Sequence, residues 1–369
     1  MSVPVIRCAD CGFEYPQKGV PFVCLNCGGI FDFDSLAPKR DLKDSSLPGI
    51  WRWGLSQDFD QELPIVSLGE GNTPLIRDTF AGKQIAMKCE YLNPTGSFKD
   101  RGTSVLISEL LVRKVEAAVE DSSGNAGASF AAYAARAGIH AKVFIPSSAS
   151  GPKKMQIVKH GAEIIEIEGP REAAAIAVRD IARKGIAYAS HAYLPFGISG
   201  IATIAYELFS QLGNIPGTVI APIGHGGLLL GLIRGFSALK LGNMSLPLPF
   251  FVGVQAEACS PVVKASRAGK ESIDNSYSGE RTVAEGVRVK QPVRGKALLH
   301  ELSSGKGTFI SVREDQILAD SAELAARGFY VEPTSSLVWS ACKGLIKDLQ
   351  EPIILILTGS GLKYKDIMN

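Results

Sequence analysis

A lysine in a polar, glycine-containing turn is the residue of this sequence best suited to covalent chemistry. The turn covers residues 96–102 (GSFKDRG), follows Asn93-Pro94-Thr95, and comes just before the apolar run 105–107. Backbone N–H groups at the start of a helix favour anions, so an amine placed there could reach an anionic ligand. Lys99 is therefore either a solvated surface cation or a nucleophile that forms a Schiff base with an aldehyde.

A second glycine-rich turn could hold a phosphate group. Gly224, His225, Gly226, Gly227 and Leu228 come directly after the apolar segment 218–222. The successive N–H groups of such a turn at a helix start suit a phosphate monoester. Taken alone, a glycine turn often only allows the backbone to bend.

Two further turns could contact a ring and a carboxylate. In the turn Ser122-Ser123-Gly124-Asn125-Ala126, the Asn125 amide suits a phenolic oxygen and the backbone N–H groups suit a carboxylate. The same turn could equally be a helix cap. Thr358, after the apolar segment 353–357, either offers a neutral hydroxyl to a pyridine nitrogen or is a plain turn residue.

Four cysteines near the N-terminus have the spacing of a metal site. Cys8 and Cys11 form one Cys-x-x-Cys pair, Cys24 and Cys27 form another, and 12 residues separate the pairs. Four thiolates make a closed, tetrahedral zinc site that stabilises a fold and does no chemistry. The spacing predicts a zinc ribbon over residues 1–34, with free or redox-active cysteines, or iron, as the alternatives.

These turns recur in a chain that alternates strands with helices. We expect strands at 84–90, 116–119, 141–145, 163–167, 186–189, 218–222, 250–255 and 353–357. We expect helices at 130–137, 151–160, 171–183, 201–212, 228–239, 314–327 and 335–348, with 258–307 irregular. This alternation predicts an α/β protein with parallel sheets and helices on both faces. The strand-to-helix turns should then open at one edge, where ligands bind.

Length and charge narrow the classes of protein. At 369 residues the chain is long enough for two α/β lobes and an appendage. Because 39 Lys and Arg nearly balance 37 Asp and Glu, a nucleic acid or acidic membrane surface is not expected as a partner, whereas a small molecule is. Without an 18-residue apolar window or a leader-like start, and with paired cysteines, we expect a cytoplasmic, reducing location.

Together these turns resemble the fold type II family of pyridoxal-phosphate enzymes, and the threonine synthases most closely. The stretches that carry the resemblance are 70–75, 93–102, 122–129, 224–227, 331–335 (VEPTS) and 357–363, and the ribbon is similar to that of many threonine synthases. The resemblance implies that Lys99 holds pyridoxal 5'-phosphate covalently, next to Phe98. It also implies that Asn125 contacts the ring oxygen, that residues 224–228 bind the phosphate and that Thr358 contacts the ring nitrogen.

The same resemblance implies a substrate site and a domain plan. The implied substrate contacts are Thr73, Ser122, Ser123, Gly124, Asn125, Ala126, Lys153 and His191. A large cofactor-binding domain would comprise 35–100 and 195–369, and a small mobile domain 101–194. The protein would act on an amino acid and form a homodimer.

The implied reaction converts O-phosphohomoserine and water to threonine and phosphate, with Lys99 as the base. Two departures from threonine synthases leave the substrate open: residues 190–203 contain no Arg, and Ser360 stands where His is usual. The alternatives are a serine/threonine dehydratase or a cysteine-type synthase of the same fold. A non-enzymatic alternative is a zinc-ribbon binding protein with a degenerate cofactor lobe.

Overall fold

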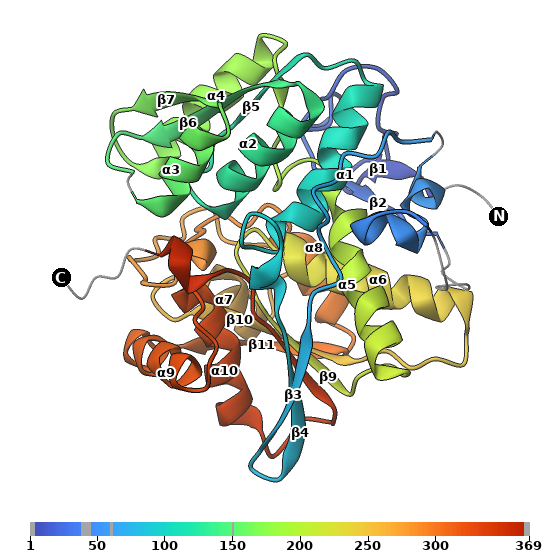
Figure 1. Ribbon diagram of the computed structural model, residues 1–369, viewed down its shortest axis with the longest axis vertical. Coiled ribbons are helices and arrows are strands. Elements are labelled where there is room, and N and C mark those ends of the chain that lie inside the picture. The colour runs from blue at the N-terminus through green and yellow to red at the C-terminus, as the bar shows by residue number, and fades with distance from the viewer. Residues whose placement is uncertain (1–3, 38–45, 60–61, 150, 365–369) are drawn as a thin grey trace.

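A six-stranded sheet forms the centre of the larger part of the molecule (Figure 1). The computed structural model describes residues 4–37, 46–59, 62–149 and 151–364. The strands of this sheet are β3 (Leu75–Phe80), β4 (Lys83–Lys88), β9 (Thr218–Pro222), β10 (Phe250–Ala256), β11 (Gly307–Val312) and β12 (Ile353–Ile356). Their order is β11-β10-β9-β12-β4-β3, and all neighbours are parallel except the edge hairpin β3–β4.

Both faces of this sheet are buried because helices cover each of them. Val219 and Ala221 of β9 belong to the core shared with α5 (Gly197–Leu212) and α6 (Gly227–Gly242). Ile220 points to the other face and joins the core around Trp339 of α10 (Pro333–Leu345). Successive residues of a strand point to opposite faces, so a strand covered on both sides must be apolar throughout.

A smaller, four-stranded parallel sheet lies above the first in Figure 1. Its order is β7-β6-β5-β8, from β5 (Ala117–Glu120), β6 (His140–Pro146), β7 (Glu163–Ile167) and β8 (Ala187–Tyr188). The helices that alternate with these strands are α2 (Asn125–Ala137), α3 (Pro152–Lys159) and α4 (Arg171–Arg183). The predicted alternation of strand and helix is confirmed here, and the bounds 163–167 and 171–183 match.

The remaining helices are α1 (Lys99–Val112), α7 (Pro261–Arg267), α8 (Gly295–Leu302) and α9 (Glu314–Ala326). The prediction that 258–307 is irregular was wrong in part, because α7 and α8 lie within it and β11 begins at its end. The prediction of purely parallel sheets was wrong for β3, which pairs antiparallel with β4 at the sheet edge. In the described part of the chain no helix is both long and apolar enough to cross a membrane.

The N-terminal segment contains a small antiparallel pair, β1 (Ile6–Cys8) and β2 (Phe31–Phe33). It packs on the main body through Tyr15, whose ring stacks edge-on against Phe196 just before α5. The connector that follows also packs on the main body, because the Trp51 indole donates a hydrogen bond to the Ser104 hydroxyl of α1 over 3.0 Å. The exact division into lobes at 101–194 stays a prediction.

Candidate active site

A cavity of about 560 Å³ lies where the strand-to-helix turns of both sheets meet. Pro222 at the end of β9, Thr358 just after β12 and Ser122 just after β5 all line it. The carboxyl ends of parallel strands are the edge at which α/β sheets bind ligands. The two sheets therefore open toward one shared space.

The cavity collects the predicted cofactor and substrate residues with one exception. The predicted residues that line it are Phe98, Lys99, Ser122, Ser123, Gly124, Asn125, Ala126, Lys153, His191, Gly224, His225, Gly226, Gly227, Leu228 and Thr358. They come from turns that lie far apart in the sequence. Thr73 does not line the cavity.

Lys99 is the first residue of α1 and follows β4 through a short turn, as the sequence predicted. Its ammonium lies 4.1 Å from the centroid of the Phe98 ring. Burial lowers the pKa of Lys99 to about 8, and the charge of Arg171 lowers it further against the opposite effect of Glu120 and Glu332. A sizeable fraction of this amine is therefore neutral and nucleophilic near neutral pH.

The lysine turn is held by the turn that follows β12. The N–H of Phe98 donates to the Thr358 carbonyl over 3.0 Å, and the N–H of Ser360 donates to the Gly96 carbonyl over 3.0 Å. Gly96 has φ +84°, a conformation that favours glycine. These paired backbone bonds fix the position of Lys99 relative to Thr358.

Behind the lysine turn, Arg101 forms a buried ion network. Its guanidinium donates to the Glu90 carboxylate over 2.7 Å and to the Glu207 carboxylate over 2.8 Å. The Thr73 hydroxyl donates to Glu90 over 2.7 Å, and the Lys88 ammonium donates to Glu207 over 2.7 Å. Thr73 thus belongs to the support of α1, and the expectation that it contacts substrate does not fit its position.

The turn after β9 has the shape of a phosphate cradle. Gly226 has φ +97°, and a Cβ on it would lie 3.0 Å from the Cβ of Arg294. A Cβ on Gly224 would lie 2.6 Å from the Gly286 carbonyl oxygen. The turn leads into the N-terminus of α6, so its backbone N–H groups and the helix dipole favour an anion.

His225 in this turn is a neutral side chain with unused hydrogen-bonding capacity. Burial lowers its pKa to about 3, and the charges of Arg171 and Lys99 act in the same direction. Its Nδ1 is buried and has no hydrogen-bond partner among the described residues. The ring meets that of His191 edge-on, with 5.7 Å between centroids.

Asn125 begins α2 and lines the cavity from the small sheet. Its amide nitrogen donates to both carboxylate oxygens of Glu332 over 3.0 Å, whereas its Oδ1 is buried without a partner in the described chain. The Thr358 hydroxyl lies 3.1 Å from the Ser335 hydroxyl. Both side chains therefore have polar atoms that a ring ligand could use.

Several residues in and beside the cavity received no role from the sequence. Glu332, just before α10, accepts from Asn125 and lies 3.3 Å from the Lys153 ammonium. Glu120, at the end of β5, lies 2.8 Å from the Nδ1 of His191. Arg171 was visible only as the first residue of a predicted helix, and Glu332 only as part of the stretch VEPTS. Neither position indicates by itself which way the side chain points.

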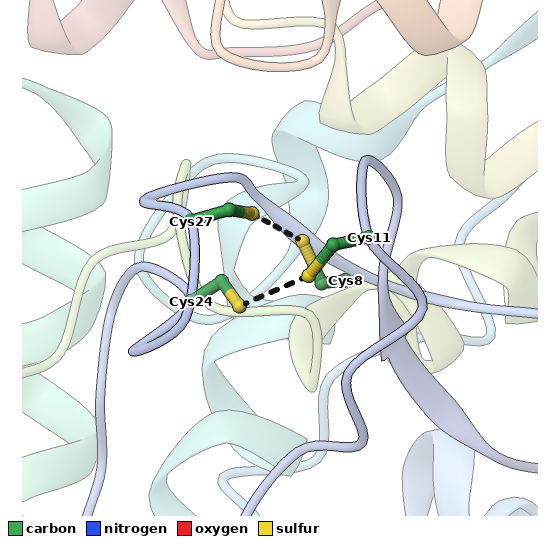
Figure 2. A group of neighbouring side chains, drawn as sticks. All are labelled: Cys8, Cys11, Cys24 and Cys27. Carbon is green, nitrogen blue, oxygen red and sulfur yellow. Dashed lines mark hydrogen bonds between the residues drawn. The ribbon is translucent and has the colours of Figure 1, made fainter.

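The four N-terminal cysteines gather as the spacing predicted (Figure 2). Their sulfur atoms all lie within 4.8 Å of one another. The Sγ atoms of Cys8 and Cys27 are 3.4 Å apart, and those of Cys11 and Cys24 are 3.6 Å apart. Four thiolates at zinc–sulfur bond length have sulfurs ~3.8 Å apart, so this donor set fits a zinc ion.

Comparisons with known proteins agree with this geometry. Residues 66–359 match the family model described as "Pyridoxal-phosphate dependent enzyme". Threonine synthase of Methanosarcina acetivorans is 30% identical over 97% of this chain and 92% of its own, and that of Methanocaldococcus jannaschii is 32% identical over 98% and 93%.

Solved structures show the same fold over most of the chain. Maize serine racemase has a TM-score of 0.69 at 24% identity and covers 80% of this chain and 89% of its own. A bacterial-type threonine deaminase, described as that of "T.th.", has a TM-score of 0.68 at 28% identity and covers 80% and 94%. With these matches around a buried lysine and a glycine cradle, the chain belongs to the pyridoxal-phosphate-dependent enzyme family and is a lyase that uses this cofactor.

Proposed function

We propose that the protein is a threonine synthase, which converts O-phosphohomoserine and water to threonine and inorganic phosphate. The observation that carries the proposal is the extent of the likeness. The two archaeal threonine synthases align with 97% and 98% of the chain, whereas the racemase and deaminase structures each cover 80%. The ribbon, which precedes the matched residues 66–359, is the part of the chain most consistent with this subgroup.

The residues of the cavity fit pyridoxal 5'-phosphate. Gly224 and Gly226 leave the space that a phosphate needs, and the orphaned polar atoms of His225 and Asn125 are free to bond a ligand. In this proposal residues 224–228 bind the phosphate, Asn125 and Thr358 contact the ring, and Phe98 lies beside the lysine. When bound, the cofactor withdraws electrons from the substrate and makes its carbon-bound protons acidic.

The chain's own groups then bind the amino acid and move protons. The turn 122–126 presents backbone N–H groups at the start of α2, which suit the substrate carboxylate. Lys99, with a pKa of about 8, can both accept a proton from a substrate carbon and return it. Burial of the site excludes bulk water from the reacting atoms.

A parallel incubation with O-phosphohomoserine, O-phosphoserine, serine and threonine tests the proposal. Phosphate, ammonia and the amino-acid product are measured for each compound. Threonine and phosphate in equal amounts from O-phosphohomoserine support threonine synthesis. No phosphate from that compound would contradict it.

A serine/threonine dehydratase is the second candidate. It is favoured by the likeness to the threonine deaminase structure and by the lack of an Arg in 190–203. Ammonia and a 2-keto acid from serine or threonine, without phosphate from O-phosphohomoserine, would identify this activity. The cysteine-type synthase would instead release phosphate from O-phosphoserine only with a sulfur nucleophile present.

We also propose that Cys8, Cys11, Cys24 and Cys27 bind one structural zinc ion. All four coordination positions would be filled by protein, so no open position remains for a substrate. The homodimer stays a prediction that analytical ultracentrifugation can check, and the cytoplasmic location stays one that cell fractionation can check.

A further inference from the structure

A phosphorylated substrate brings close to two negative charges into a cavity that already holds the cofactor phosphate. Such a group needs cations or several N–H and hydroxyl donors in place of its hydration shell. Residues 190–203 contain no Arg to provide them. The positive charge must therefore come from another element that reaches the cavity.

The two neighbouring lysines are already paired. The Lys153 ammonium lies 3.3 Å from the carboxylate of Glu332, so its charge is largely balanced. Lys154 lies 2.6 Å from Glu166 and is not a cavity residue. Lys363 does line the cavity, but its ammonium donates to the Thr95 carbonyl over 2.6 Å and holds the lysine turn.

His191 cannot provide a charge either. Burial places its pKa well below the usual value, and the charges of Lys99, His225 and Arg171 act in the same direction. Its Nδ1 is engaged with the Glu120 carboxyl at 2.8 Å. His191 is thus a neutral ring whose other nitrogen faces no partner in the described chain and can take part in one hydrogen bond.

Arg171 has the charge that these residues lack. It is the first residue of α4, it lines the cavity, and it has no ion pair or hydrogen bond within the described ranges. After the larger effect of burial, its charge helps lower the pKa values of Lys99, His191 and His225. A guanidinium that acts on groups from three other elements lies within the cavity and is not directed to solvent.

We propose that Arg171, assisted by His191, forms a second anion subsite that binds the phosphoryl group of the substrate, apart from the glycine cradle of the cofactor. This inference rests on the proposed function for its substrate. The planar guanidinium can donate two parallel hydrogen bonds to phosphate oxygens, which a lysine cannot do. Arg171 thus takes the place of the Arg missing from 190–203, and it reaches the site from the small sheet instead.

The other two cavity arginines lie on the side of the cradle. Arg281 and Arg288 flank Gly286, whose carbonyl oxygen occupies the space next to Gly224. Loss of either should affect the cofactor phosphate more than the substrate. Arg288→Gln therefore serves as a comparison within the same cavity.

The test compares Arg171→Gln with Arg183→Gln, a control on the same helix. Arg183 has a 66% exposed side chain paired with Asp180, so its loss changes net charge equally without touching the cavity. Inorganic phosphate is titrated calorimetrically into each cofactor-loaded protein. Because the cofactor fills the cradle, the heat reports the second subsite.

We expect Arg171→Gln to weaken inorganic phosphate binding about ten- to hundredfold, the effect of a lost charge-assisted pair. Arg183→Gln should change it less than about twofold. The KM for O-phosphohomoserine should rise with the phosphate dissociation constant, and Arg171→Lys should fall between the two proteins. The dissociation constant of pyridoxal 5'-phosphate should stay unchanged in Arg171→Gln and rise in Arg288→Gln.

Three results would overturn the subsite. They are equal phosphate affinity in wild type and Arg171→Gln, no phosphate binding by the loaded wild type, and loss of cofactor affinity in Arg171→Gln. If Arg171→Gln fails to fold by circular dichroism, Arg171→Lys provides the same comparison. If the wild type binds phosphate through Arg171 but releases none from O-phosphohomoserine, the proposed function fails and the subsite stands.

Discussion

The backbone N–H of Arg294 donates a hydrogen bond to the carbonyl of His225 over 2.9 Å. The guanidinium of the same residue donates to the carbonyl of Phe31 in β2 over 2.9 Å and lies 3.5 Å from Asp32. One residue therefore contacts both the N-terminal segment and the glycine cradle. Its Cβ also occupies the space that a side chain on Gly226 would need.

This contact predicts that the ribbon supports cofactor binding. Arg294→Met should raise the dissociation constant of pyridoxal 5'-phosphate by about tenfold or more, because the buried carbonyl of Phe31 and the carboxylate of Asp32 lose their partner. The control is Lys296→Met, which removes only an exposed ion pair with Asp10. Fluorescence titration of the cofactor-free proteins measures the change. Equal affinity in both variants would show that the cradle does not depend on Arg294.

Loss of the metal should reach the cradle by the same route. A Cys24→Ser, Cys27→Ser double variant should lose about one zinc per chain by metal analysis, because a closed site needs all four thiolates. Its cofactor should dissociate faster than that of the wild type. The matched control is Cys89→Ser together with Cys342→Ser, two buried cysteines outside the cluster. An unchanged zinc content in the first variant would disprove the ribbon site.

Lys99→Ala should abolish covalent cofactor binding, because no other cavity lysine is placed at the start of α1. The protein should become colourless on dialysis and inactive, and borohydride should no longer attach the cofactor. Lys153→Ala, from the same cavity, is the control and should keep the covalent bond. Mass spectrometry of peptides after reduction locates the attachment. Label on a peptide other than that of Lys99 in the wild type would refute the assignment.

Covalent loading of the cofactor-free protein should depend on pH. The pKa of Lys99 is lowered to about 8, so the reactive neutral amine predominates above this pH and the charged form below it. The rate at which pyridoxal 5'-phosphate attaches should therefore rise about tenfold per unit up to pH ~8 and then level off. Stopped-flow absorbance over this range measures the midpoint. A midpoint near the ordinary lysine value would show that burial does not activate the amine.

The buried ion network should be sensitive to removal of one partner. Glu207→Leu leaves Arg101 and Lys88 with uncompensated charge and should lower the free energy of unfolding by about 3–5 kcal/mol. Adding Lys88→Met should recover part of this loss, because it removes one of the stranded charges. Glu163→Gln, in an exposed pair with Lys142, should cost less than about 1 kcal/mol. Urea unfolding compares the four proteins, and equal costs for Glu207→Leu and Glu163→Gln would contradict the network's role.

The sequence alone determined the features that depend on neighbours in the chain. The helix over 171–183 and the strand over 163–167 follow from periodicity within each segment, and the structure has the same bounds. The placement of Lys99 after a strand and at the start of a helix is equally local. The two cysteine pairs also indicated their own cluster, because each pair is held by a single short turn.

The tertiary structure alone decided which way isolated polar side chains point. Thr73 looked like a substrate contact but donates to Glu90 behind the lysine turn, because α1 and β4 place a buried charge there. Arg171 looked like an ordinary helix start, yet α4 directs it into the cavity between the sheets. A side chain at the end of an element faces whatever packs against that end. For both residues the neighbours come from other elements of the chain, so no local pattern records them.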